Sequence, residues 1–174
     1  MVLTKEELIS ALQQEVRILL HLAGKVDRAQ LDYRPTPKQR STLELLQYLA
    51  VMGPVQVQMI RAGEFSRAAF SAAWTPAEAA AEAMSFDDSV AAIGKLGEYY
   101  ARELGEWSDA DFRQELDMFG NKSSRGLMLI QMLLAAHAAY RTQFFCYLKS
   151  CGREELSTIN LWGGIDAPPA SAKA

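Results

Sequence analysis

Two polar residues late in the chain, His137 and Arg141, occupy positions where a helix would otherwise be apolar. At about 100° per residue, His137 falls in the middle of an apolar stripe, and Arg141 lies one turn further along the same face. The stripe is formed by Ile130, Leu133, Leu134, Phe144 and Leu148. We therefore expect both polar side chains to be buried. Because a guanidinium does not readily lose its proton, Arg141 needs a carboxylate, several carbonyl groups or a bound anion beside it.

This pair of residues has two interpretations. In the first, His137 is a core residue and Arg141 pairs with an acidic residue of another helix, since structural ion pairs are common. In the second, both side chains line a cavity that receives a ligand. The second histidine of the chain, His21, lies opposite the apolar stripe of its own helix, so we expect it at the surface or at the rim of the core.

Several other chemistries lack the residues that they need. The two cysteines, Cys146 and Cys151, are too few for a disulfide framework and do not form a C-x-x-C motif. The sequence contains neither a glycine-rich phosphate loop nor a G-x-S-x-G motif. We therefore exclude a disulfide-rich scaffold, a nucleotide-binding enzyme and a serine hydrolase.

The composition is typical of one globular domain. The chain has 174 residues, of which 49% are hydrophobic and 22% are charged, and this is enough for one substantial core. The formal net charge of -3 provides no basic excess for binding nucleic acid or a membrane surface. Lys5, Glu6 and Glu7 interrupt any signal peptide, so we expect a cytoplasmic protein. We expect a single domain over residues 1–165 and a disordered tail over residues 166–174.

Helix-start signals and apolar spacing predict four amphipathic helices. Thr4 and Ser41 each precede a glutamate by three residues, which is the arrangement of a capping box. The predicted helices cover about residues 5–23, 42–60, 86–104 and 124–151, with a further short helical piece that begins near Thr75. Long connections are expected at 62–75 and 105–122, and strand signals are nearly absent. We therefore predict an all-α four-helix bundle with a short C-terminal extension.

Several segments, taken in order along the chain, resemble motifs of the DinB-like (damage-inducible) superfamily. They are Tyr33-Arg34-Pro35 with Ser41, Leu45, Leu46 and Leu49, which resemble R-P-x-P…S-x-x-E-x-x-x-H-L; His137 to Gln143, which resemble H-x-x-x-H-R-x-Q; Tyr147 to Gly152, which resemble Y-L-R-x-x-G; and Asn160 to Gly164, which resemble N-L-W-x-G. The resemblance covers nearly the whole chain.

This resemblance implies a four-helix bundle, often a homodimer, that holds a divalent metal such as Zn or Ni with three histidines. Characterised relatives include thiol-cofactor-dependent transferases and a mycothiol-dependent isomerase. The present chain has Tyr48 and Arg141 where the family pattern places two of the histidines, and His137 alone remains. One imidazole is a poor site for such a metal, and Arg141 adds a positive charge beside it. We therefore predict no metal cofactor.

These departures lead to three functional hypotheses. The first is a metal-free DinB-like protein in which Tyr48, His137 and Arg141 line a polar pocket for a small anionic ligand, bound through Arg141. The second is a transferase or isomerase, related to the bacillithiol- and mycothiol-dependent enzymes, that activates a thiol with His137 and Arg141. The third is a non-catalytic protein that acts through a dimer surface. We expect a homodimer and no nucleic-acid or membrane partner.

Overall fold

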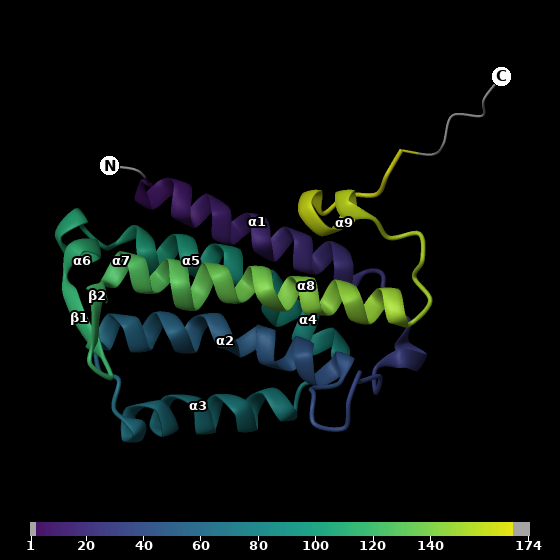
Figure 1. Cartoon of the computed structure of the whole chain (residues 1–174), viewed down its shortest axis with the longest axis horizontal. Coiled ribbons are helices and arrows are strands. Elements are labelled where there is room, and N and C mark those ends of the chain that lie inside the picture. The colour runs from purple at the N-terminus through teal and green to yellow at the C-terminus, as the bar shows by residue number, and fades with distance from the viewer. Residues whose placement is uncertain (1–2, 169–174) are drawn as a thin grey trace.

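Four helical segments surround a common core in the computed structural model, which describes residues 3–168 (Figure 1). The segments are α1 (Lys5–Ala23), α2 (Thr42–Ala62), α4 (Phe86–Gly94) continued by α5 (Leu96–Gly105), and α7 (Arg125–Met128) continued by the π-helical η2 (Leu129–Leu134) and by α8 (Ala135–Ser150). The predicted all-α four-helix bundle is therefore confirmed. In this part of the chain, none of the helices is both long and apolar enough to cross a membrane.

The helix starts follow from local hydrogen bonds that the sequence encodes. Thr4 Oγ1 accepts from the Glu7 amide at 3.1 Å while the Glu7 carboxylate accepts from the Thr4 amide at 2.7 Å. Ser41 and Glu44 form the same reciprocal pair at the start of α2. Each pair satisfies amide donors that the first helical turn leaves without a partner. The predicted starts of α1 and α2 are therefore confirmed.

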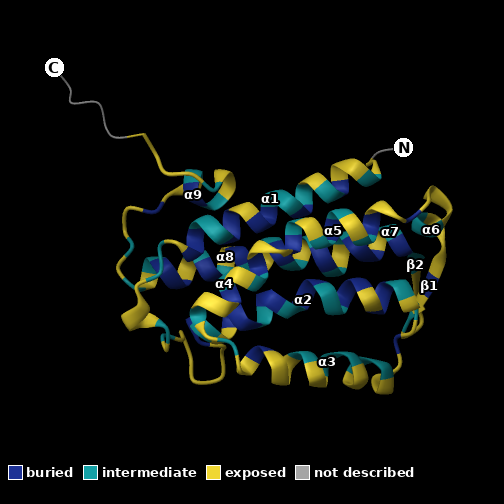
Figure 2. Cartoon of the chain, turned by 180° about the vertical axis from the view of Figure 1, so that it is seen from behind, coloured by how far each residue is buried: buried dark blue, intermediate teal, exposed yellow. Residues whose placement is uncertain are grey.

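The segment expected as a long connection at 62–75 is mostly helix. Helix α3 (Arg67–Glu82) begins where the Ser66 hydroxyl accepts a hydrogen bond from the Ala69 amide at 3.1 Å, and it continues through Pro76. Helix α3 lies outside α2, on the side of α2 away from α1 (Figure 1). Only Ala81 of α3 is fully buried, and Figure 2 shows the helix mostly exposed. The prediction failed here because α3 has no broad apolar stripe.

The second long connection, at 105–122, also contains regular structure. Helix α6 (Asp109–Arg113) is followed by a hairpin of β1 (Glu115–Met118) and β2 (Asn121–Ser124). The two strands are antiparallel and pair Glu115 with Ser124. Phe119 and Gly120 turn the chain with positive φ angles of 56° and 86°. Glycine adopts such angles readily, whereas they are uncommon for phenylalanine. The sequence has almost no strand signals, so this short hairpin was not predicted.

The π-helical turn changes which residues of the last long helix are buried. Ile130 and Leu134 were expected on the buried stripe, but both are only half-buried. Met128 and Leu129, which precede the expected stripe, are buried instead. A π turn holds more residues than an α turn, so it rotates the face that precedes it relative to the face that follows. From α8 onward the expected stripe is observed, with Phe144 fully buried.

Small elements close the ends of the bundle. Beyond η1 (Arg28–Gln30), the chain forms a loop that leads into α2. Helix α9 (Thr158–Gly163) packs on α1, where Asn160 Nδ2 lies 3.1 Å from His21 Nε2, so His21 lies at the rim beneath α9. The expected tail 166–174 lies outside the described residues from 169 onward. Asp166 is described, and its carboxylate accepts from Lys25 Nζ at 2.7 Å.

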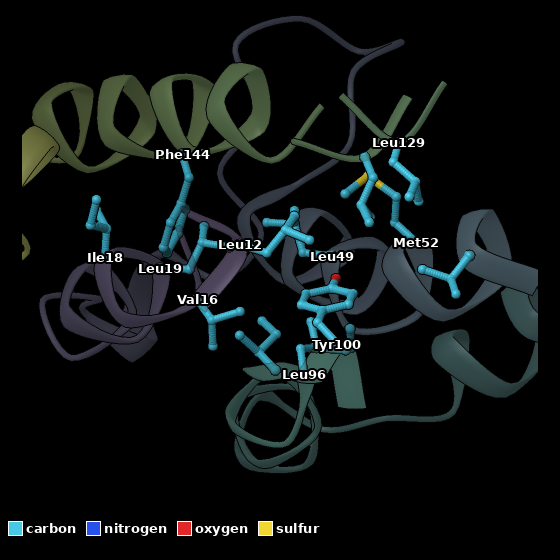
Figure 3. Close-up of a cluster of buried hydrophobic side chains, with 14 of the residues drawn as sticks. Leu12, Val16, Ile18, Leu19, Leu49, Met52, Leu96, Tyr100, Leu129 and Phe144 are labelled. Atoms are coloured by element: carbon cyan, nitrogen blue, oxygen red, sulfur yellow. The ribbon is translucent and has the colours of Figure 1, made fainter. Parts of the chain in front are cut away.

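The core joins α1, α2, α5 and the last long helix (Figure 3). Its largest fully buried side chains include Tyr100 of α5 and Phe144 of α8. Tyr100 reaches the backbone of α2 at Gly53, where a Cβ atom would overlap the tyrosine hydroxyl and lie 2.8 Å from Cζ. The absent side chain at position 53 therefore makes room for Tyr100 in the centre of the bundle.

We predict that Gly53→Ala destabilises the protein by about 1–3 kcal/mol, because the added methyl group overpacks the core against Tyr100. The matched control is Gly94→Ala, also within a helix, where an added Cβ has no atom within 4 Å. This control should be neutral or stabilising by up to about 1 kcal/mol. Urea unfolding of both variants measures the difference, and equal stabilities would contradict the packing described here.

Candidate ligand-binding site

Arg141 forms a buried ion pair inside the bundle. Its Nη1 donates to Glu15 Oε1 of α1 at 3.0 Å, and the two residues are 3% and 9% exposed. The guanidinium also lies over the Trp162 ring, with Cζ 5.0 Å from the ring centroid. Burial raises the pKa of the Glu15 carboxyl, and the nearby Arg141 charge opposes that rise. Of the two interpretations of Arg141, the structure therefore supports the first, in which Arg141 pairs with an acidic residue of another helix.

His137 is sealed in the core beside Tyr100. Its Nε2 lies 2.7 Å from the tyrosine hydroxyl, and the residue has 0% exposure. Burial lowers the pKa of His137 to about 4, because a charged imidazolium is poorly solvated there. The imidazole is therefore neutral near pH 7. Its Nδ1 has no hydrogen-bond partner among the described residues.

Tyr48 lies on a different side of the bundle and belongs to an aromatic cluster. Its ring stacks on Trp74 of α3 at 5.5 Å and meets Tyr140 of α8 edge-on at 5.0 Å. The guanidinium of Arg40 covers the Tyr48 ring at 4.0 Å. Burial, followed by the neighbouring Tyr140, raises the pKa of the Tyr48 hydroxyl. Tyr48 is therefore a neutral hydroxyl near pH 7 and not a phenolate.

The structure does not bring Tyr48, His137 and Arg141 together in one pocket within residues 3–168. Consecutive positions of a helix point about 100° apart, so Tyr140 faces Tyr48 of α2 while Arg141 faces α1. His137 faces α5 instead. The polar pocket expected from these three residues is corrected accordingly. Because His137 has no exposed surface, it also has no contact surface for a thiol substrate in this structure.

The residues at these positions do not fit a three-histidine metal site. Tyr48 is held protonated, Arg141 is paired with Glu15, and His137 faces Tyr100. Among the described residues, no group of three or more histidine, cysteine, aspartate or glutamate side chains is placed to hold a metal ion. We therefore derive no chemistry through a metal.

A cleft of about 530 Å³ lies beside Tyr48 on the outer side of α2. Gly63, with φ of 70°, reverses the chain between α2 and α3, so the end of α3 lies beside the start of α2. The loop that precedes α2 closes the cleft from a third side. Its polar lining comprises Asp32, Arg34, Arg40, Ser41, Glu44, Gln47, Tyr48, Glu78 and Glu82, and its apolar lining comprises Leu43, Val51 and Ala81.

The charged groups of the cleft differ in whether they have partners. Glu44 accepts from the Ser41 amide at 2.7 Å and from Arg34 Nη2 at 3.1 Å, so Glu44 and Arg34 neutralise each other. These contacts lower the pKa of the Glu44 carboxyl, with the Ser41 hydrogen bond as the largest cause. Arg40 forms no ion pair with any described residue and stacks on Tyr48. Its charge contributes a little to the lowered pKa of Glu44, but its N–H groups form no hydrogen bond or ion pair with a described side chain.

The comparisons with known proteins agree with this architecture. A crystal structure of the DinB-like protein YjoA from Bacillus subtilis superposes with a TM-score of 0.64 and covers 87% of this chain and 95% of the YjoA chain. The two sequences are 18% identical. This chain has a DinB-like fold. No family model matches the sequence, and no curated protein matches it either.

Within this DinB-like fold, most residues of the cleft were missed from the sequence. Tyr48 was singled out, but Arg40, Gln47 and the two α3 glutamates were not. Arg40 directly precedes the helix cap Ser41, and such loop positions carry no periodic signal. Glu78 and Glu82 are four residues apart, which places them on one face, and this spacing was the available clue. Without α3 in place, however, that face had no assigned neighbour.

We predict that Arg141→Met destabilises the protein by about 3–5 kcal/mol, because it leaves the Glu15 carboxylate buried without its partner. The control is Arg34→Met, which removes an ion pair whose side chains are 36% and 46% exposed, and it should cost no more than about 1 kcal/mol. Lowering the pH from neutral should restore part of the loss in Arg141→Met, because the folded state takes up a proton on Glu15 at a higher pH than the unfolded state. Chemical unfolding at several pH values measures both effects, and losses of equal size in the two variants would contradict the buried pair.

We predict that His137 contributes to acid unfolding. Its pKa of about 4 lies below its ordinary value of 6.5, so the folded state binds fewer protons than the unfolded state between these pH values. Stability should fall as the pH drops through this window, with a total loss of about 3 kcal/mol from this residue. The slope of the unfolding free energy against pH is proportional to the number of protons that the protein takes up on unfolding. In His137→Gln this number should be smaller, by up to about one proton, between pH 6.5 and 4. An unchanged slope between pH 6.5 and 4 would show that His137 is protonated in the folded protein.

Proposed function

We propose that this protein binds a small organic molecule in the cleft between α2 and α3, with Arg40 holding an anionic group of that molecule. The proposal keeps the small anionic ligand expected from the sequence but transfers its recognition from Arg141 to Arg40. A volume of about 530 Å³ lies in the range of small-molecule sites, roughly 300–1,000 Å³.

The stacking of Arg40 on Tyr48 is the observation that carries this proposal. The Arg40 guanidinium lies 4.0 Å above the Tyr48 ring and contacts the ring through the face of its own plane. The N–H groups along the edge of the guanidinium are then left for a planar carboxylate or a phosphate. Such bidentate hydrogen bonds are among the stronger polar contacts in proteins. Arg34 and Arg141 are paired with Glu44 and Glu15, whereas Arg40 has no such partner among the described residues.

The surroundings of Arg40 hold the stacked arrangement in place. Tyr48 is clamped between Trp74 of α3 and Tyr140 of α8, so the platform beneath the guanidinium is fixed by three helices. The backbone carbonyl of Arg40 accepts a hydrogen bond from the Tyr147 hydroxyl at 3.0 Å. Arg40 is itself exposed, so the stacking surface and the backbone beneath it are what these contacts fix. A binding group that is partly fixed in this way loses less entropy when a ligand is bound.

We predict that Arg40→Gln weakens the binding of straight-chain carboxylates by about tenfold or more, because a hydrogen bond to a charged group contributes about 1.5–3 kcal/mol. Isothermal titration calorimetry with caproate, adipate and their shorter and longer homologues measures the effect. The control is Arg67→Gln, which removes an exposed arginine outside the cleft and should leave binding unchanged. Binding of these carboxylates with equal affinity to the wild type and to Arg40→Gln would falsify the proposal.

A further inference from the structure

We infer that the ligand of the cleft carries a primary ammonium group as well as the anionic group, and so belongs to the amino-carboxylate class. This inference rests on the proposed function, because it concerns the same cleft. It is carried by Gln47, by the end of α3 and by the two glutamates that α3 contributes to the lining.

Gln47 presents an oriented hydrogen-bond acceptor at the cleft. Its side-chain amide nitrogen donates to the Met84 carbonyl at 2.8 Å and lies 3.4 Å from the Glu82 carbonyl. Because both partners are acceptors, the amide nitrogen must face them and Oε1 must face elsewhere. The residue is only 7% exposed, yet Oε1 accepts no hydrogen bond from the described residues and is not sealed from solvent. A ligand that donates a hydrogen bond would satisfy this oxygen.

The end of α3 favours a positive charge at the same place. The helix ends at Glu82, and its last carbonyl groups form the negative end of the helix dipole. The Glu82 carbonyl faces the Gln47 amide nitrogen at 3.4 Å, so Oε1, which points away from that carbonyl, lies one amide group from this helix end. An ammonium group that donates to Oε1 is therefore close enough to the helix end to gain from its dipole.

The carboxylates of Glu78 and Glu82 add negative charge to this end of the cleft. Both residues line the cleft, lie four positions apart on α3, and form no ion pair with any described residue. Arg34 and Glu44 neutralise each other, which leaves Arg40 against Asp32, Glu78 and Glu82. A ligand with only negative groups would meet this excess of negative charge, whereas an added ammonium group reduces it.

Positive and negative lining groups both lie near the same aromatic residue. The Arg40 guanidinium lies 4.0 Å from the Tyr48 ring, and Glu78 lines the same cleft as Tyr48. One small molecule in the cleft can therefore reach both charges. No group of three or more metal-binding side chains is found among the described residues, so the acidic end of the cleft suits an ammonium group better than a metal ion.

The test compares four molecules of six carbon atoms each by isothermal titration calorimetry: ε-aminocaproate, adipate, caproate and hexamethylenediamine, each with its shorter and longer homologues so that the distance between the charged groups is matched. We expect the best amino-carboxylate to bind about tenfold or more tightly than the matching dicarboxylate and monocarboxylate. In the double variant Glu78→Gln with Glu82→Gln, this preference should fall to less than about threefold, while carboxylate binding through Arg40 persists. The control Glu98→Gln removes an exposed glutamate outside the cleft and should keep the preference.

The outcomes separate the two proposals. If carboxylates bind through Arg40 and the ammonium group adds no affinity, the amino-carboxylate inference is wrong and the proposed function stands. If the preference survives unchanged in the double glutamate variant, the placement of the ammonium group beside Glu78 and Glu82 is wrong. If the diamine binds as tightly as the amino-carboxylate and Arg40→Gln has no effect, the proposed function is wrong. If no molecule of the series binds at any length, both are wrong. Because the glutamates are exposed, the double variant should fold, and its circular dichroism spectrum checks this.

Discussion

The hydroxyl of Tyr100 occupies the space that a side chain at position 53 would take, and the packing of the bundle depends on this contact. Through it α5 approaches the backbone of α2, and the same hydroxyl lies 2.7 Å from His137 of α8. Three helices therefore meet at one polar atom, the Tyr100 hydroxyl. A buried hydroxyl needs a partner, and His137 supplies it while remaining neutral. His137 therefore has a structural role as the hydrogen-bond partner of Tyr100.

The same logic places Arg141 among the structural residues. Its charge is neutralised by Glu15 inside the protein, so Arg141 does not need an anionic ligand as a counter-charge. Ligand recognition is then left to groups whose charges and hydrogen bonds are not satisfied internally. At the outer side of α2, Arg40 has no ion-pair partner and Gln47 Oε1 has no hydrogen-bond partner among the described residues, and both line the cleft beside the end of α3. A DinB-like bundle can thus keep a closed core and still carry a polar site on its flank.

Features that depend on neighbouring residues could be predicted from the sequence, and features that depend on distant contacts could not. The capping pairs at Thr4 and Ser41 predicted the helix starts, because their hydrogen bonds span three residues. Helical periodicity predicted that His137 and Arg141 are buried. It could not identify Glu15 as the partner of Arg141, because that residue lies 126 positions away. The π turn escaped prediction too, since a fixed angle per residue assumes an uninterrupted α-helix.

The position of α3 has a consequence for the availability of the cleft. This helix packs on α2 through Phe70, Ala73 and Trp74, which are only half-buried, and Ala81 is its one buried residue. Most of α3 is therefore exposed to solvent. Segments with few buried contacts open locally more often than the core does. If α3 opened locally, Glu78 and Glu82 would leave the cleft and the stacking of Trp74 on Tyr48 would be lost. The measured affinity of a ligand then scales with the fraction of molecules in which α3 is docked, and ligand binding in turn slows the hydrogen exchange of the α3 amides.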